Sequence, residues 1–194
     1  ATVFGWSMGV QVALEAWRRA PERVEAMVFA SGVDGHLLDG VPFFFGSSTV
    51  ALTLARLMRD RGAGLTDFLA RTCRAQAVKR LARTLRLVGR NADVTLEHAA
   101  LLLSSDPRIY WAIVERLQEH DASEVVDTIT IPVLILHGDS DVVTPVAKGR
   151  ELRTRIVGSE IWVFSGCTHA VILEYPERVV RHLRDFLQRR VSAR

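Results

Sequence analysis

The chain has 194 residues, of which 48% are hydrophobic and 24% are charged, a balance typical of one globular domain with a sizeable core. Its net charge is +3, and its arginines are dispersed among acidic and apolar residues, which argues against a nucleic-acid surface. No apolar run approaches the ~20 residues of a membrane span, and the chain does not open with a secretion signal. We therefore expect a cytoplasmic protein that needs no metal, cofactor, nucleic acid or membrane.

The first ten residues contain the most informative motif of the chain. Residues 1–6 form a short apolar run, which predicts a buried strand, and an apolar-periodic helix is expected from Met8 to Arg19 with Val12, Ala13, Ala16 and Trp17 on its inward face. Between them lies Gly5-Trp6-Ser7-Met8-Gly9, which has the form G-x-S-x-G of a nucleophile elbow.

This motif has a physical requirement. The serine must adopt a strained backbone conformation, and Gly5 and Gly9 are expected to remove Cβ atoms that would collide across the turn. The turn would expose the Ser7 hydroxyl and place the Met8 N–H at a helix N-terminus, where it can face developing negative charge. The alternative is an ordinary glycine-rich turn. A base and an acid further along the chain would favour the nucleophile elbow over that alternative.

The next elements predict the fold class. Residues 24–30 form a second apolar strand after a break at Ala20-Pro21-Glu22, so strand, helix and strand make a βαβ unit with a parallel sheet. From about residue 36 to 120 the pattern becomes helical, with expected helices at 49–61, 72–88, 96–103 and 108–119 and breaks at 62–64, 89–91 and 106–107.

The alternation of strands and helices returns near Ile131. Strands are expected at 132–136 and 160–164, and helices at 146–156 and 176–188, the last with Val179, Val180, Leu183, Phe186 and Leu187 inward. The chain therefore divides into a first core part at 1–35, a helical insertion at 36–120 and a second core part at 121–194.

Acidic and basic candidates follow the last two strands. Asp141 lies in the loop after the strand at 132–136, and His169 lies in the loop after the strand at 160–164. Because the carboxyl ends of parallel strands share one edge of the sheet, both side chains are expected near Ser7. An imidazole can take the serine proton, and a carboxylate can orient the imidazole and stabilise its charged form.

Asp139 and His137 are the competing acid and base, although His137 lies at the end of the wrong strand. The remaining histidines are expected to be structural or solvated: His36, His98, His120 and His182. Cys167 is close to His169 in sequence, but an elbow centred on serine leaves it no evident role. Together with Cys73 it is expected to be a free thiol.

Three motifs together resemble those of α/β-hydrolase-fold proteins. They are the elbow at residues 5–9; Gly138, Asp141 and Pro145, which match G-x-x-D-x-x-x-P; and His169, Glu174 and Pro176, which match H-x-x-x-x-E-x-P. The elbow sequence is also similar to that of carboxylesterases in this family. The order Ser, Asp, His along the chain is the order found in that fold.

The resemblance implies an α/β fold, with a parallel-sheet hydrolase core and an all-helical cap insertion. It also implies Ser7 as nucleophile, Asp141 as acid, His169 as base and Met8 as an oxyanion-hole donor. Relatives with other chemistry carry aspartate at the elbow, so Ser7 favours acyl chemistry. Trp6, Phe43 and Phe44 are candidates for lining an apolar substrate pocket, although phenylalanines of this kind also serve as core anchors.

The expected reaction is hydrolysis of a small or medium apolar carboxylic ester through an acyl-serine intermediate, with that small molecule as the partner. The same three residues could instead serve perhydrolysis, C–C hydrolysis or acyl transfer. A truncated binding fragment without activity is the alternative outside enzyme chemistry.

The sequence departs from the family pattern in two respects. Thr168 stands where the family usually has glycine before its histidine. The family also places four or more strands before the elbow, and those N-terminal strands would contribute a second oxyanion donor, whose loss typically costs about 10²–10³ in turnover. We therefore expect a preceding segment of the same protein, and an insoluble or nearly inactive chain when these residues are expressed alone.

Overall fold

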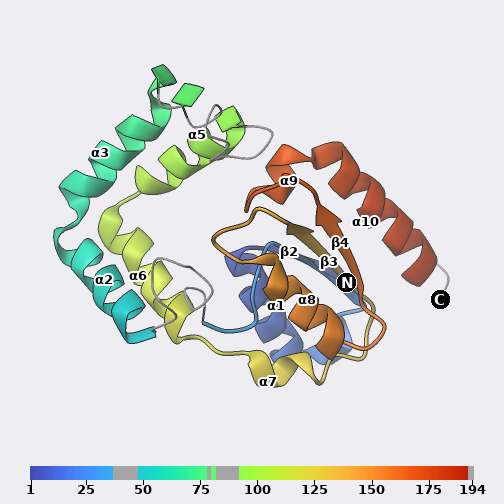
Figure 1. Ribbon diagram of the computed structural model, residues 1–194. Helices are drawn as coiled ribbons and strands as arrows, with labels where there is room; N and C mark the ends of the chain where they lie inside the picture. The colour runs from blue at the N-terminus through green and yellow to red at the C-terminus, as the bar shows by residue number, and fades with distance from the viewer. Residues whose placement is uncertain (37–47, 78–79, 82–91, 192–194) are drawn as a thin grey trace.

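The structure, a computed structural model, describes residues 1–36, 48–77, 80–81 and 92–191. Within these residues, four strands form one fully parallel sheet in the order β1-β2-β3-β4, with bounds β1 Thr2–Trp6, β2 Ala26–Ala30, β3 Val133–Gly138 and β4 Glu160–Phe164. Helices lie against both faces of this sheet (Figure 1). The α/β class expected from the sequence is therefore confirmed.

Each face of the sheet has its own apolar core. On one face lie α1 (Met8–Arg19), α7 (Ser123–Val126) and α8 (Val146–Arg155), and on the other lie α9 (Val171–Glu174) and α10 (Pro176–Arg190). Phe29 of β2 belongs to the first core and Val28 to the second, as the alternation of a strand requires. Strands β2 and β3 are buried along their whole length, which explains their continuous apolar sequence.

The inward faces of two helices differ from the prediction. Val12 is 60% exposed, because it lies two residues after the buried Val10 and hence about 200° around α1. Val180 is 42% exposed, whereas its neighbour Val179 is buried. The periodic pattern placed the helices correctly but did not fix the rotation of each helix about its axis.

The segment between β2 and α7 is mainly helical in the residues that the structure describes. Its helices α2 (Ser48–Arg61), α3 (Ala63–Arg74), α5 (Ala92–Leu103) and α6 (Pro107–Glu119) are called the helical insertion. Helix α2 packs against α6 and α3 packs against α5, and α5 also reaches α9 beside the sheet (Figure 1). Within the described ranges, no helix has the length and apolar character needed to cross a membrane.

One expected helix has a different start. The sequence predicts a helix at 72–88 after a break at 62–64, but α3 begins at Ala63 and ends at Arg74, Ala75 is extended, and residues 76–77 and 80–81 are helical. Gly62 does not form a loop, because its N–H donates to the Met58 carbonyl and its own carbonyl accepts from Thr66 N–H, each at 2.8 Å. Glycine is tolerated at such a junction between helices although it is usually a breaker. Residues 78–79 and 82–91 lie outside the described residues.

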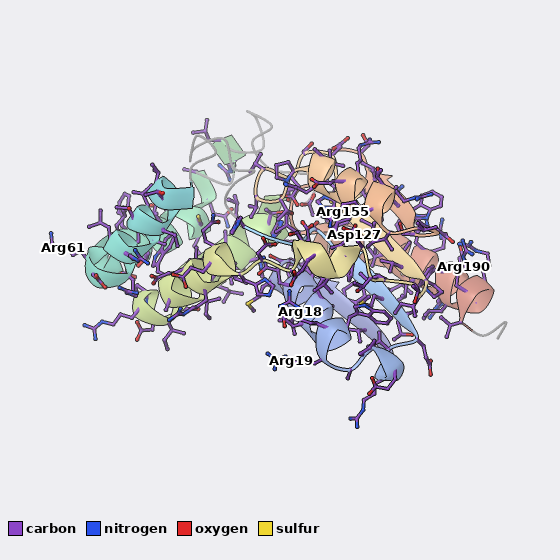
Figure 2. All side chains as sticks on the ribbon, turned by 90° about the horizontal axis from the view of Figure 1, so that it is seen from below. Arg18, Arg19, Arg61, Asp127, Arg155 and Arg190 are labelled. Carbon is purple, nitrogen blue, oxygen red and sulfur yellow. The ribbon has the colours of Figure 1, made fainter. Side chains whose placement is uncertain are left out.

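Arg155, the last residue of α8, joins the two chain segments that flank the helical insertion. Its guanidinium donates to Asp34, which follows β2, at 2.9 Å, and to both carboxylate oxygens of Asp127, which precedes β3, at 2.9 Å each. Arg155 and Asp127 are labelled next to each other in Figure 2. Because Asp34 is 6% exposed, the arginine compensates a carboxylate that would otherwise be buried without a counter-charge.

The elbow turn after β1 depends on a close approach of two backbone segments. A Cβ atom at Gly5 would lie 2.3 Å from the Gly9 carbonyl oxygen and 2.7 Å from Val10 N. A Cβ atom at Gly9 would have nothing within 4 Å. The expected steric requirement therefore holds at Gly5 and is wrong at Gly9, because the first turn of α1 passes over Gly5 while Gly9 points into open space.

These contacts predict different effects of two matched substitutions. Gly5→Ala should destabilise the protein by about 3 kcal/mol or more, since the new methyl group meets rigid backbone. Gly9→Ala, within α1, should leave the free energy of unfolding unchanged or raise it by up to about 1 kcal/mol, because alanine favours the helix. Urea unfolding of both variants tests this, and equal losses at the two positions would contradict the assigned close approach.

Candidate active site

Ser7 lies in the turn between β1 and α1 with φ 55° and ψ −118°. A positive φ is uncommon for a residue with a side chain, so this backbone is strained as the elbow motif predicts. The Ser7 N–H donates to the Ala30 carbonyl at the end of β2 at 2.9 Å, which fixes the turn on the sheet. The Met8 N–H begins α1 at the positive end of the helix dipole.

The structure brings Ser7, His169 and Asp141 together at the carboxyl edge of the sheet. His169 Nε2 lies 2.8 Å from Ser7 Oγ, and His169 Nδ1 lies 2.9 Å from Asp141 Oδ2. If the Nδ1 proton is donated to the carboxylate, Nε2 is left as the acceptor for the serine hydroxyl. The three side chains can therefore pass a proton from the hydroxyl to the imidazole.

Asp141 is buried and fully engaged by hydrogen bonds. Its Oδ1 accepts from Val143 N and Thr144 N at 2.9 Å each, and its Oδ2 accepts from Thr144 Oγ1 at 2.7 Å. Burial acts to raise the pKa of Asp141, but the hydrogen bond and charge of His169 and the bonds from Thr144 outweigh it, so the pKa is lowered. The Thr144 hydroxyl is also 3.2 Å from His169 Nδ1. Sequence reasoning did not identify this threonine.

Asp139 and His137, the competing acid and base, take no part in the contacts that join Ser7, His169 and Asp141. Asp139 is exposed and accepts from Gly166 N at 2.8 Å and Ser140 Oγ at 2.9 Å, so it joins two loops. His137 is 1% exposed, burial lowers its pKa, and its ring nitrogens make no hydrogen bond to the described residues. Cys167 is buried and donates to the Thr168 carbonyl at 3.4 Å, and burial raises the pKa of its thiol. A thiolate is therefore disfavoured there.

Two aromatic side chains lie beside His169. The Trp6 indole Nε1 donates to the His169 carbonyl at 3.0 Å, and the two rings are 6.3 Å apart. The His98 ring, from α5, lies 5.0 Å from the Trp6 ring at an angle of 35°. Burial and the charge of His169 lower the pKa of His98.

The sequence predicts a solvated or structural role for His98, and the structure places its ring against Trp6. No sequence signal distinguishes it from the other histidines outside the motifs, which do make structural contacts: His36 with the Gln118 carbonyl, His120 with Glu15 and His182 with Trp162. Only the docking of α5 brings His98 to Trp6.

The Thr168 side chain makes a hydrogen bond that a glycine at this position could not make. Its N–H lies 3.2 Å from Glu174 Oε1, and its hydroxyl donates to the same oxygen. Glu174, the acid of the H-x-x-x-x-E-x-P motif, is 7% exposed. The departure from the family pattern therefore adds a contact within the loop that carries His169.

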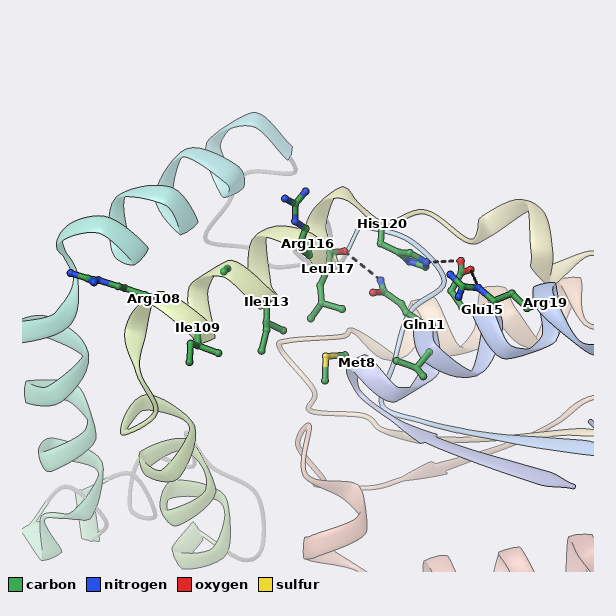
Figure 3. A pocket seen from close by; sticks show the side chains of 12 residues that line it. Met8, Gln11, Glu15, Arg19, Arg108, Ile109, Ile113, Arg116, Leu117 and His120 are labelled. Carbon is green, nitrogen blue, oxygen red and sulfur yellow. Dashed lines mark hydrogen bonds and ion pairs between the residues drawn. The ribbon is translucent and has the colours of Figure 1, made fainter.

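Phe43 and Phe44, predicted to line the substrate pocket, lie outside the described residues. A groove of about 720 Å³ lies between α1 and α6 (Figure 3). Half of its lining residues are apolar, among them Met8, Val12, Ile109 and Ile113, and the other half are polar or charged, among them Arg108 and Arg116. It meets the candidate site only at Met8, and Ser7, Asp141 and His169 do not line it. Among the described residues, no cluster of three or more histidine, cysteine or acidic side chains could hold a metal ion.

The parallel sheet, the strained serine elbow and the adjoining histidine and aspartate define an α/β hydrolase. A family described as serine aminopeptidase, S33, matches residues 1–176, and the chain belongs to this family. Similar curated proteins include pimeloyl-[acyl-carrier protein] methyl ester esterases from Nitrosomonas europaea, 28% identical over 180 residues, and from Aromatoleum aromaticum, 29% identical over 184 residues. These matches cover 92% and 91% of this chain and 68% and 70% of the relatives.

Solved structures show the same fold at lower identity. A bromoperoxidase from Bacillus anthracis superposes with a TM-score of 0.69 at 21% identity, covering 96% of this chain and 67% of that one. A thermophilic esterase from Thermogutta terrifontis superposes with a TM-score of 0.70 at 19% identity, covering 97% of this chain and 65% of that one. The chain thus spans about two thirds of the length of the proteins it resembles.

The lowered pKa of Asp141 predicts an acid-dependent contribution to stability. Because its folded pKa lies below the ordinary 3.8, this contribution should be complete above about pH 4 and should be lost as the pH falls through the folded pKa. Asp141→Asn should therefore reduce the free energy of unfolding by about 1–3 kcal/mol at pH 7, with a smaller difference from wild type at pH 3. Urea unfolding at both pH values measures this.

Ser7→Ala is the matched control, because it removes the neighbouring hydroxyl but leaves Asp141 and His169 in contact. It should keep the pH dependence of the wild type. A constant difference between wild type and Asp141→Asn from pH 7 to pH 3 would contradict the stabilised carboxylate.

Proposed function

We propose that the protein hydrolyses carboxylic esters of small or medium apolar acids through an acyl-Ser7 intermediate. The observation that carries the proposal is the continuous contact from Ser7 Oγ to His169 Nε2 at 2.8 Å and from His169 Nδ1 to Asp141 Oδ2 at 2.9 Å. A strained elbow that presents the hydroxyl, a base within hydrogen-bond distance and a buried acid behind it are the parts that acyl transfer to serine requires.

In the first half of the reaction, Ser7 Oγ attacks the ester carbonyl carbon while His169 Nε2 takes its proton. The resulting oxyanion faces the Met8 N–H at the N-terminus of α1, where the helix dipole favours negative charge. His169 then gives the proton to the departing alkoxide, the C–O bond breaks, and the acyl group remains on Ser7.

In the second half, water replaces the alcohol. His169 takes a proton from the water as its oxygen attacks the acyl carbon, and returns that proton to Ser7 Oγ as the acid leaves. Asp141 keeps its negative charge throughout, since its four hydrogen-bond donors stabilise the carboxylate, and it stabilises the imidazolium in both halves.

The groove between α1 and α6 supports an apolar substrate. It begins at Met8, directly after the nucleophile, and its exposed apolar side chains include Val12, Ile109 and Ile113. Two relatives that match over nine-tenths of this chain are named as esterases acting on the methyl ester of a carrier-bound pimeloyl group. We therefore propose a methyl or other small alkyl ester of an apolar acyl chain as the substrate class.

A fluorophosphonate probe tests the nucleophile. It should label Ser7 in this chain or, where the gene encodes a longer product, in that product, because only a serine with a working base reacts readily. Ser7→Ala should abolish labelling, and His169→Ala should slow it by about 10²–10⁴. Mass spectrometry locates the label.

The outcomes separate the alternatives. Labelling of another residue, or none in any folded form of the protein, would contradict the hydrolase and favour a binding role. Labelling of Ser7 without hydrolysis of any ester would favour perhydrolysis, C–C hydrolysis or acyl transfer by the same residues.

The groove gives a second prediction, on acyl-chain length. Ile113→Asp should lower kcat/KM for nitrophenyl octanoate about tenfold and leave nitrophenyl acetate unchanged, because the proposal places only the longer acyl chain in the groove that Ile113 lines. Val157→Asp is the matched control, since Val157 is 87% exposed and does not line the groove. Equal effects of Ile113→Asp on both esters would show that the acyl chain does not use this groove.

A further inference from the structure

Helix α5 of the insertion is linked to the loop that carries His169 through two intermediate side chains, Glu174 and Trp6. The contacts come from Thr95 and His98, which are three residues apart and therefore share one face of the helix. Neither residue belongs to a motif that the proposed hydrolase chemistry uses. Both contacts lead to main-chain groups at the candidate base.

The first contact passes through a buried carboxylate. Thr95 Oγ1 donates to Glu174 Oε1 at 3.3 Å, and the same oxygen accepts from the Thr168 N–H at 3.2 Å and from the Thr168 hydroxyl. The other oxygen, Oε2, is buried and has no hydrogen-bond partner among the described residues. All the hydrogen bonds observed at the Glu174 carboxylate are therefore accepted by Oε1, and this oxygen joins Thr95 of α5 to Thr168.

The second contact passes through the elbow strand. The His98 ring lies 5.0 Å from the Trp6 ring, and the Trp6 indole N–H donates to the His169 carbonyl at 3.0 Å. Because the two rings are in contact at an angle of 35°, the His98 ring limits the rotation of Trp6 and hence the direction of its N–H. The carbonyl on one side of His169 and the N–H of Thr168 on the other are both tied to α5.

We propose that Thr95 and His98 are positioning residues that couple the docking of the helical insertion to the alignment of the catalytic base. The proposal rests on the proposed function, in which His169 must hold 2.8 Å to Ser7 and 2.9 Å to Asp141 at the same time. A displacement of about 1 Å at such a base can cost about 10² in rate. An insertion displaced from the sheet would release both contacts, and the base would be aligned only when α5 is docked.

The test uses substitutions that break each contact and conservative ones that restore it. Thr95→Val removes the hydroxyl and Thr95→Ser keeps it, while His98→Ala removes the ring and His98→Phe keeps it. The matched control is Glu97→Gln on the same helix, since Glu97 lies 3.5 Å from Arg74 of α3 and not at the base loop.

Two quantities are measured, either in this chain or, if only a longer product of the gene folds, in that product. The first is the rate of fluorophosphonate labelling together with kcat and KM for an apolar ester. Thr95→Val and His98→Ala should each lower the labelling rate and kcat about tenfold with little change in KM, because the base is misaligned while the substrate surface is intact. Thr95→Ser, His98→Phe and Glu97→Gln should stay near wild type.

The second readout does not depend on catalysis. The ring N–H of His169, hydrogen-bonded to Asp141, should give a low-field proton NMR resonance that exchanges faster with solvent in Thr95→Val and His98→Ala than in wild type or Glu97→Gln. Unchanged exchange and labelling in both variants would overturn the proposal. Failure of labelling in wild type would instead contradict the hydrolase, and the exchange of this resonance would still decide the positioning role.

Discussion

The strained backbone of Ser7 is the constraint on which the candidate site depends. A φ of 55° costs free energy at a residue with a side chain, and the turn persists because its surroundings determine it. The Ser7 N–H is bonded to β2, and the first turn of α1 crosses directly over Gly5. Gly32 leaves room for Val10, since a Cβ atom there would lie 2.3 Å from Val10 Cγ2. Packing of β1 and α1 against β2 therefore offsets the strain.

The loops that carry Asp141 and His169 are held together by their main chains. A Cβ atom at Gly138 would lie 2.2 Å from the Cys167 carbonyl oxygen, so the histidine loop passes directly over this glycine. Ser140 N donates to the same carbonyl at 3.0 Å, and Asp139 N donates to the Phe164 carbonyl at 3.1 Å. The glycine of G-x-x-D thus permits a close approach that brings acid and base within hydrogen-bond distance.

The fold by itself does not select the reaction. Proteins with TM-scores near 0.7 and about a fifth of identical residues are described as an esterase and as a bromoperoxidase. One fold hosts several chemistries because the parallel sheet supplies only the positions at its edge, while the loops and the insertion supply the surroundings. In this chain the insertion reaches the site through α5, whose residues contact Trp6 and Glu174.

The sequence by itself determined the α/β class, the strands and most helices, and the edge at which Ser7, Asp141 and His169 meet. These follow from local patterns, since an apolar strand and the loop after it fix where a residue stands in a parallel sheet. Tertiary structure decided the rotation of α1 about its axis, which leaves Val12 exposed, and it decided that α3 ends at Arg74. It also decided the contacts of Thr144 with Asp141, of Thr95 with Glu174 and of His98 with Trp6. Such contacts join elements far apart in the chain, and helical periodicity carries no information about which neighbour a helix will meet.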